Sequence, residues 1–263
     1  MAETSGKPVA VVTGASSGLG IDFAAELAKD GYDLVLVARS TEALESVAAD
    51  LKTKHGANSH VLTHDLAKAG AGAALAAAIG EAGIEPEVLI NNAGFGSNDD
   101  FATADPGMLS EMTQLNVVTL TDLTRALLPG MIAKRNGRIM LLASTASFQP
   151  GPHMAVYCAT KAYVLSFGEA IAYELRGTGV SVTTVCPGAT KTGFQKTAGV
   201  DESSPYLRSG IMSSADVARQ GYRAMKAGTP VVVTGIPNLV SAAMGRHMPH
   251  AFVLPLAARI LGK

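Results

Sequence analysis

Short apolar runs alternate with longer helical stretches along almost the whole chain. Most of these runs are continuously apolar and rich in Val, Ile and Leu, which is typical of strands buried on both faces of a parallel sheet. The segments between them are rich in Ala, Leu and Glu. Seven strands are expected, at residues 8–14, 33–39, 59–65, 87–94, 137–144, 180–188 and 230–235. The alternation predicts an α/β fold, a Rossmann-type doubly wound parallel sheet flanked by helices. No linker, repeat or low-complexity block divides residues 1–263, so one domain is expected.

The composition and charge give no sign of a nucleic-acid, metal or membrane partner. Hydrophobic residues make up 48% of the 263 positions and charged residues 16%, enough apolar material for a large core. The net charge of −1 gives no sign of a nucleic-acid partner. Cys158 and Cys186 are the only cysteines, and their spacing fits no metal site, so free thiols in a reducing cytoplasm are expected. No signal peptide and no run of about 18 apolar residues is apparent, which also favours a soluble cytoplasmic protein.

A glycine-rich loop, TGASSGLG at residues 13–20, follows the first expected strand directly. Gly14, Gly18 and Gly20 have the spacing GxxxGxG at a turn from a strand to a helix. Glycine lets the backbone N–H groups approach a pyrophosphate closely, and the next helix offers its positive dipole end to the phosphates. A turn without a ligand is the alternative, but the surrounding α/β pattern favours a dinucleotide site.

Arg39 indicates which dinucleotide binds. An NAD site usually carries an acidic residue at the end of the second strand for the ribose 2′-hydroxyl. Here no acid follows that strand, and Arg39 occupies the region instead. An arginine suits the 2′-phosphate of NADP through charge-assisted hydrogen bonds. The alternative, a solvated surface arginine, leaves a cation unexplained at a helix start, where it opposes the dipole.

Tyr157 and Lys161 are four residues apart, so on a helix they share one face. A phenol has a pKa of about 10, which is too high for proton transfer at neutral pH. An ammonium about 5 Å away would favour the phenolate by roughly 3 kcal/mol at an effective dielectric near 20. The pair could therefore act as a general acid–base. A core tyrosine beside a snorkelling lysine is the alternative.

Several polar motifs converge with this pair on one edge of the expected sheet. Ser144, the NNAG sequence at 91–94 and the PG sequence at 187–188 all follow the carboxyl ends of strands, as the glycine loop does. Ligands of open α/β sheets bind at these ends.

In these motifs the chain resembles the classical short-chain dehydrogenases/reductases over residues 7–235. TGASSGLG, NNAG, Asn116 in LNVV, Ser144, YCATK and PGATKT occur in the expected order. The resemblance implies that Tyr157 transfers a proton to or from the substrate oxygen, with Lys161 lowering its pKa and binding the nicotinamide ribose. It also implies that Ser144 polarises the carbonyl, and that Asn116 bends its helix and helps hold a water linking Lys161 to solvent. The ARS sequence at 38–40 looks like the NADP-preferring branch.

The resemblance also implies cofactor contacts by Asp65 with the adenine, by Asn92 with the sheet and the cofactor loop, and by Thr190 and Thr192 with the carboxamide and phosphates. Asn116 as an ordinary buried amide and Asp65 as a helix N-cap near Ala67 remain alternatives. The expected residues around NADP(H) are Gly14, Ser16, Ser17, Gly18, Leu19, Gly20, Arg39, Asp65, Leu66, Asn92, Ala93, Gly94, Tyr157, Lys161, Pro187, Gly188, Thr190 and Thr192.

The expected function is hydride transfer between NADP(H) and a carbonyl or secondary alcohol, in a homodimer or homotetramer. An apolar pocket is expected from segments carrying Phe95, Phe148, Met154, Phe194 and Tyr206, which suggests a bulky apolar ketone or a 3-oxoacyl-type substrate. The alternative is a non-catalytic NADP-binding sensor on the same fold.

Two segments near the C-terminus have a separate interpretation. Residues 189–213 are polar, long and without a period, which suggests a substrate lid. Residues 236–263 are apolar and basic, and no acidic residue follows Asp216. They are expected to form a subunit interface or a cover over the substrate cleft. Contact with a lipid surface or an acyl-carrier partner is the less favoured alternative.

Overall fold

The core of the molecule is a seven-stranded sheet in which every strand pairs in parallel with its neighbours. The computed structural model describes residues 6–199 and 211–261. The strand order is β3-β2-β1-β4-β5-β6-β9. The chain adds β2 and β3 on one side of β1 and the later strands on the other, so the strand order reverses between β1 and β4. The strands are β1 (Val9–Thr13), β2 (Asp33–Ala38), β3 (Ser59–Thr63), β4 (Val88–Asn91), β5 (Gly137–Leu142), β6 (Val180–Cys186) and β9 (Val231–Val233).

All seven expected strands are present, and the doubly wound parallel architecture is confirmed. The strands end earlier than the apolar runs do. Residues 92–94 and 187–188 lie beyond β4 and β6, because the chain leaves the sheet there to form the rim that carries the polar motifs. A two-stranded ladder, β7 (Thr190–Lys191) with β8 (Met212–Ser213), follows β6 and was not expected from the sequence.

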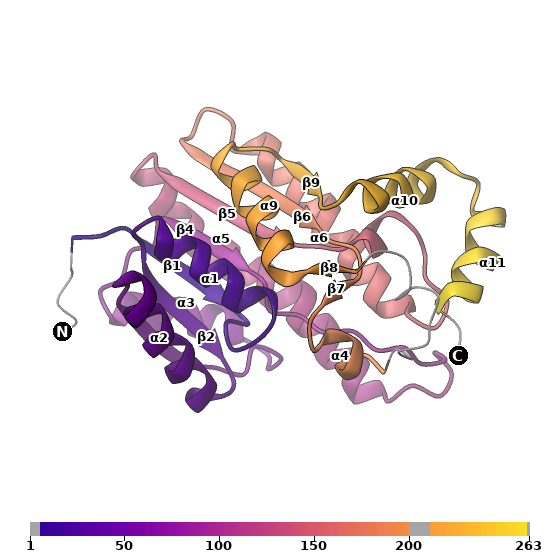
Figure 1. Ribbon diagram of the computed structural model, residues 1–263, viewed down its shortest axis with the longest axis horizontal. Helices are drawn as coiled ribbons and strands as arrows, with labels where there is room; N and C mark the ends of the chain where they lie inside the picture. The colour runs from indigo at the N-terminus through magenta and orange to yellow at the C-terminus, as the bar shows by residue number, and fades with distance from the viewer. Residues whose placement is uncertain (1–5, 200–210, 262–263) are drawn as a thin grey trace.

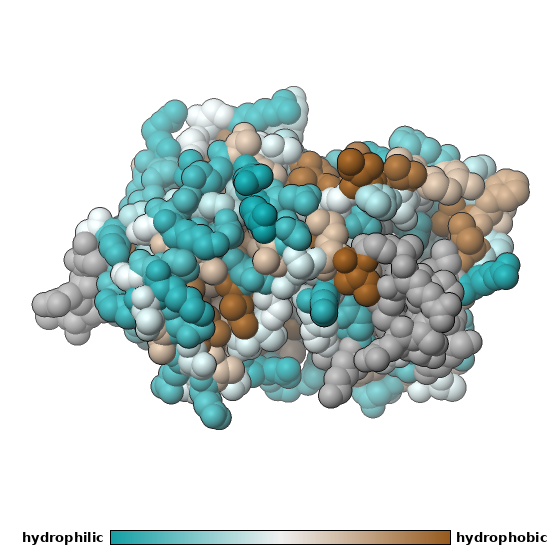
Figure 2. Space-filling view, in the orientation of Figure 1, coloured by the Kyte–Doolittle hydropathy of each residue, from teal (hydrophilic) through white to brown (hydrophobic). Residues whose placement is uncertain are grey.

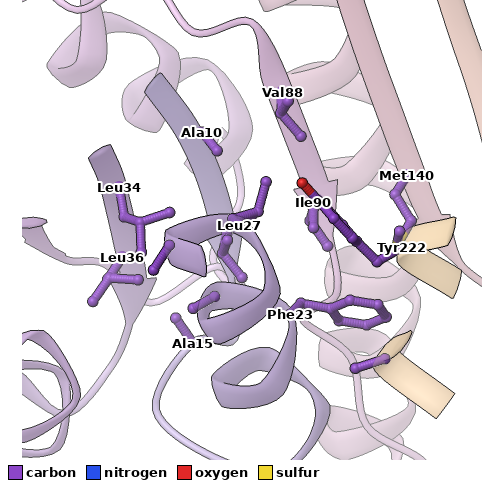
Figure 3. Close-up of a cluster of buried hydrophobic side chains, with 14 of the residues drawn as sticks. Ala10, Ala15, Phe23, Leu27, Leu34, Leu36, Val88, Ile90, Met140 and Tyr222 are labelled. Carbon is purple, nitrogen blue, oxygen red and sulfur yellow. The ribbon is translucent and has the colours of Figure 1, made fainter. Parts of the chain in front are cut away.

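One face of the sheet packs against α1 (Leu19–Lys29), α2 (Thr41–His55) and α9 (Ser214–Lys226). Phe23 and Leu27 of α1 lie over the strands, and Tyr222 of α9 closes the same cluster beside Met140 (Figure 3). Alternate strand residues such as Ala10 and Val12 point to this side.

The opposite face packs against α3 (Ala71–Glu81), α5 (Leu120–Ala133) and α6 (Ala155–Glu174). Val11 of β1 and Leu141 of β5 point into this second cluster with Leu75, Leu123 and Val164 from the helices. Both faces are therefore covered, which accounts for the continuously apolar strands.

The remaining elements lie around the carboxyl ends of the strands (Figure 1). They are α4 (Pro106–Thr113), the π-helix η1 (Gln114–Thr119), the 3₁₀-helix η2 (Thr145–Phe148), α7 (Phe194–Thr197), α10 (Ile236–His247) and α11 (His250–Leu261). α10 and α11 extend from the sheet at one end of the molecule. None of the helices in the described parts of the chain is long and apolar enough to cross a membrane.

The suggested lid falls partly outside the described residues. Residues 190–199 and 211–213 are described and contribute β7, α7 and β8, whereas residues 200–210, with Tyr206, are not. The lid interpretation stays a prediction.

Candidate active site

A cavity of about 420 Å³ opens at the carboxyl ends of β4, β5 and β6. It brings together many of the residues that the sequence placed at this rim. Those that line it are Leu19, Asn92, Gly94, Ser144, Tyr157, Lys161, Pro187, Gly188, Thr190 and Thr192. The convergence arises because the carboxyl ends of parallel strands meet at one edge of the sheet.

The glycine loop between β1 and α1 has the conformation that its glycines require. Gly14 has a φ of 66° and Gly18 a φ of 52°, both in the left-handed region. A Cβ on Gly20 would overlap the carbonyl of Gly14, so the helix start and the strand end approach too closely for any side chain. A Cβ on Gly18 would come within 3.2 Å of Thr192, which places the loop against the segment after β6. Ser16 and Ser17 lie in the same turn, within the loop that precedes α1.

Asn92 holds this loop in place. Its Nδ2 donates to the carbonyl oxygens of Thr13 at 2.9 Å and Gly14 at 3.2 Å. In return, the Thr13 hydroxyl accepts from the backbone N–H groups of Asn92 and Ala93, both at 3.0 Å. β1 and β4 are adjacent across the switch in strand order, and these bonds fix the two rim loops to each other.

Tyr157 and Lys161 both lie in α6, and both are buried, with exposed fractions of 8% and 5%. The Lys161 Nζ lies 5.8 Å from the centroid of the Tyr157 ring. Tyr157 also packs against the ring of Phe194 with the centroids 5.3 Å apart. A Cβ on Gly96 would come within 2.8 Å of Tyr157, so the chain after β4 lies directly against the tyrosine.

Lys161 occupies an unusual position for an ammonium group. Its Nζ donates to the carbonyl oxygen of Leu142 at 2.8 Å, at the end of β5. Burial lowers the pKa of Lys161 to about 8, and the nearby Cys186 thiol offsets part of this effect. The snorkelling alternative is wrong, because the lysine turns inward to the cavity.

Ser144 caps η2, two residues beyond the end of β5. Its Oγ accepts from the N–H of Ala146 at 3.1 Å and lies 3.4 Å from the Pro187 carbonyl. Ser147 links this turn to α6, since its Oγ accepts from the Ser144 N–H and donates to the Lys161 carbonyl at 2.8 Å. The sequence analysis did not identify Ser147, because the apolar and polar pattern gives no signal for such a bridge.

Asn116 lies in the π-helix η1, which interrupts the helical path from α4 to α5. Its Nδ2 donates to the Phe95 carbonyl at 2.9 Å and to the Thr160 hydroxyl at 3.1 Å, and its Oδ1 accepts from the Phe95 N–H at 3.2 Å. The resemblance implied that Asn116 bends its helix; the structure shows a π-helical turn at this residue, and the bend and the held water stay predictions. A Cβ on Gly94 would lie 2.9 Å from the Asn116 Oδ1 and 3.4 Å from the Lys161 Nζ, so all three groups meet at one point.

Three residues expected at the adenosine end follow the neighbouring strands instead of lining the cavity. Arg39 is exposed directly after β2, and Asp65 is exposed after β3. The Asp65 Oδ1 accepts from the Ala67 N–H at 3.1 Å, a local turn, whereas α3 begins only at Ala71. Leu66 is buried in the core, and its carbonyl accepts from Thr119.

The substrate side of the cavity differs in part from expectation. Met154 and Phe194 line it as predicted, but Phe95 packs against Met112 and Tyr157 behind it, and Phe148 packs into the core under α6. Large aromatic residues can occupy either place, and the sequence alone does not separate them. Among the polar lining residues, the sequence analysis did not point to Gln149 or Cys158. Gln195 comes from the segment 189–213, and Pro237, Asn238, Ser241 and Ala257 come from the segment 236–263, for which a cover over the substrate cleft was one of the two expected roles.

Neither cysteine has the features of a reactive group. Cys158 and Cys186 are buried and free, and burial raises the pKa of Cys158 to about 11 and that of Cys186 to about 12. Across residues 6–199 and 211–261, no cluster of three or more His, Cys, Asp or Glu side chains is placed to hold a metal ion.

The comparison with known proteins agrees with this geometry. A sequence model of the short chain dehydrogenase family matches residues 8–203, which is well over half of the chain. The chain belongs to the short-chain dehydrogenase family. The short-chain dehydrogenase from Sphingobium yanoikuyae, solved in complex with NADPH, is 30% identical, with a TM-score of 0.81 over 90% of this chain and 94% of its own.

Two relatives illustrate the range of proteins similar to this short-chain dehydrogenase. Ketoacyl reductase HetN of Nostoc sp. is 34% identical over 234 residues, covering 89% of this chain and 80% of its own. A very-long-chain 3-oxoacyl-CoA reductase of Laccaria bicolor is 33% identical over 177 residues, covering 66% of this chain and 52% of its own. The chain therefore spans about half the length of some of the curated relatives it matches.

Proposed function

We propose that this short-chain dehydrogenase is an NADP(H)-dependent oxidoreductase that interconverts a carbonyl and a secondary alcohol. The observation that carries the proposal is the placing of Ser144, Tyr157 and Lys161 on one cavity that also contains the rim residues of a dinucleotide site. A non-catalytic sensor would need the residues that bind the dinucleotide, but it would not need Ser144, Tyr157 and Lys161 together.

Residues of the cavity fit a nicotinamide dinucleotide. Gly94 lines the cavity, where a Cβ would crowd the side chains of Asn116 and Lys161, and in the adjoining glycine loop a Cβ on Gly14 or Gly20 would meet atoms of the neighbouring chain within 3.0 Å. The loop before α1 precedes a helix N-terminus, which favours a pyrophosphate. When bound, the cofactor supplies or accepts a hydride at the carbon of the substrate carbonyl. Arg39, exposed beyond β2, would receive the 2′-phosphate of NADP(H).

The side chains of the site divide the remaining work of carbonyl reduction. The Tyr157 hydroxyl donates a proton to the carbonyl oxygen as negative charge develops there. The Ser144 hydroxyl hydrogen-bonds the same oxygen and stabilises that charge. The buried ammonium of Lys161 favours the resulting phenolate electrostatically, and it reaches the cofactor side of the cavity beside Gly94. In alcohol oxidation each proton moves in the opposite direction.

The cavity supports a bulky, largely apolar substrate. Met154, Phe194, Ala189, Pro237 and Ala257 contribute apolar walls. Gln149, Asn238 and Ser241 add polar groups at the side formed by η2 and α10, where they could orient a second polar group of the substrate. Because two similar proteins are named as ketoacyl and 3-oxoacyl-CoA reductases, a 3-oxoacyl thioester is the substrate we propose first.

Assembly and location complete the proposal. Exposed apolar side chains support a homodimer or homotetramer: Tyr163 and Tyr173 of α6, Val118 of η1 and Ile132 of α5. The two buried free thiols support a reducing compartment such as the cytoplasm. Light scattering of the purified chain tests the oligomeric state.

The decisive experiment follows NADPH oxidation at 340 nm with a panel of carbonyl compounds. The panel contains a 3-oxoacyl thioester, a steroid ketone, a bulky aryl ketone and a small ketone, each also tested with NADH. We expect turnover of a bulky member with NADPH and little with NADH. NADPH binding without turnover of any member would favour the sensor instead.

A further inference from the structure

The outward face of α10 is apolar, which reverses the usual pattern of a surface helix. Its exposed residues Ile236, Leu239, Val240 and Met244 have exposed fractions of 79%, 54%, 55% and 44%. Leu239 and Val240 lie three and four residues after Ile236, and Met244 lies four residues after Val240, which places all of them on one face. The opposite face carries buried Ala242 and Gly245 and the cavity residue Asn238. A helix that faces water normally shows polar residues on that side.

α11 also exposes apolar side chains: Phe252 and Leu256, four residues apart, share one face, whereas Leu254, two residues from each of them, lies on another side of the helix. Phe252, Leu254 and Leu256 are exposed by 66%, 39% and 48%, whereas Val253 and Ala257 are buried, and Ala257 reaches the cavity. Figure 2 shows apolar side chains gathered over α10 at the upper edge of the molecule and over α11 at its right-hand end. We call the exposed apolar residues of the two helices the α10–α11 surface. A cluster of this kind marks an interaction site.

The charges around the α10–α11 surface indicate what it contacts. No acidic residue follows Asp216, and Arg246 and Arg259 lie exposed in the last turns of α10 and α11. Neither helix carries an Asp or Glu, so the same two helices of a second copy seated on this face would offer no carboxylate to Arg246 or Arg259. An anionic lipid surface instead complements both the apolar side chains and the cations.

We propose that the α10–α11 surface docks this protein on an anionic membrane, with the apolar side chains entering the interface and Arg246 and Arg259 contacting lipid phosphates. This inference goes beyond the oxidoreductase function and does not depend on which carbonyl is reduced. Because Pro237, Ser241 and Ala257 line the cavity from the same two helices, docking would set the cavity beside the membrane.

Co-sedimentation of the full chain with vesicles tests the proposal. The vesicles are phosphatidylcholine alone or phosphatidylcholine with phosphatidylglycerol, each at low and high salt. We expect binding to the anionic vesicles that weakens with salt, because exposed charges are screened. Arg246→Gln and Arg259→Gln should each weaken the partition about fivefold, the value for one cation at an anionic surface. Leu239→Ser with Val240→Ser should weaken it by about tenfold or more.

Matched controls separate docking from general surface effects. Phe101→Ser removes an exposed aromatic group of the segment before α4, and Arg125→Gln removes an exposed cation of α5. Both should bind vesicles as the parent does, and all variants should keep the parent melting temperature and NADPH affinity. No binding by the intact chain, or equal binding to neutral and anionic vesicles, overturns the proposal. A dimer that Leu239→Ser with Val240→Ser converts to a monomer, without vesicle binding, also overturns it and assigns the surface to a second copy.

Discussion

The ammonium nitrogen of Lys161 donates to the carbonyl oxygen of Leu142 at 2.8 Å and lies 5.8 Å from the centre of the Tyr157 ring. One cation thus joins the end of β5 to the face of α6 that carries the tyrosine. Burial of this cation costs free energy, so the stability of the folded chain depends on the protonation of Lys161.

Lys161 should make the folded protein less stable at neutral pH than at alkaline pH. Its pKa is about 8 in the folded chain against 10.5 for an ordinary lysine. Between these values the unfolded state binds more protons, so stability rises with pH through this window, by roughly 3 kcal/mol in total. We therefore expect the stability of Lys161→Met relative to the parent to fall from pH 7 to pH 10.5 in denaturant titrations. A constant difference between Lys161→Met and the parent over this pH range would contradict the expectation.

Tyr157→Phe should abolish turnover while NADPH still binds. The phenol proton is needed for the chemistry, whereas the packing of the ring against Phe194 is kept in the variant. Loss of a general acid typically reduces the rate about 10²- to 10⁴-fold. Turnover is measured at 340 nm and NADPH affinity by fluorescence. The control is Tyr163→Phe, on the exposed face of the same helix. Activity of Tyr157→Phe within a few-fold of the parent would show that the assigned role is wrong.

Arg39→Asp should shift the cofactor preference from NADPH towards NADH. The substitution removes a phosphate partner, introduces repulsion and supplies an acceptor for a ribose hydroxyl. We expect NADPH affinity to fall roughly 10- to 100-fold, the range for a lost charge-assisted hydrogen bond. Titration of both cofactors into both proteins measures the ratio. Arg125→Asp, with the same change of charge on α5, should leave the ratio unchanged. If the ratio is equal for the parent and Arg39→Asp, Arg39 does not set the preference.

Asn116→Ala should lower both the melting temperature and the activity. The amide satisfies the N–H and carbonyl of Phe95 and the hydroxyl of Thr160. Each buried polar group left without a partner costs roughly 1–3 kcal/mol. Calorimetry and the 340 nm assay measure the two effects. Gln114→Ala, in the same π-helix, loses only a bond to the Thr119 hydroxyl and should change both far less. Equal effects of the two substitutions would leave Asn116 no special role.

Gly188→Ala should displace α10 from the rim of the sheet. A Cβ on Gly188 would overlap the side-chain amide of Asn238, which itself donates to the Thr234 carbonyl at 2.7 Å. We expect a lower melting temperature that Asn238→Ala partly restores in the double variant, because the overlap is then removed. Gly130→Ala, where a Cβ meets open space, is the control. If the two substitutions lower the melting temperature additively, the methyl group added at Gly188 does not clash with the Asn238 side chain.

The sequence predicted the parts of the molecule that depend on local pattern. The seven strands follow from continuous apolar runs, and the glycine loop follows from a spacing that only a tight turn explains. Tyr157 and Lys161 were found because a helix places residues four apart on one face.

The walls of the cavity were less predictable, because contacts between distant segments build them. Asn238 and Ser241 reach the cavity only because α10 packs across η2, near Gln149. Ser147 is one of several serines in its segment, and only the folded chain shows that it bridges Ser144 and Lys161. Phe95 and Phe148 illustrate the same limit, since their apolar character suits the core as well as a pocket wall.

The proposed site is built from two separate stretches of the chain, because β1 and β4 are neighbours in the sheet but distant in the sequence. Everything assigned to the adenosine half, from the glycine loop to Leu66, precedes α3, and every residue assigned to chemistry follows it. Recombination within α3 would therefore exchange one half for that of a relative while the other is inherited intact, provided the contacts of Asn92 with Thr13 and Gly14 are kept. Cofactor preference and substrate choice could in this way evolve separately within one gene.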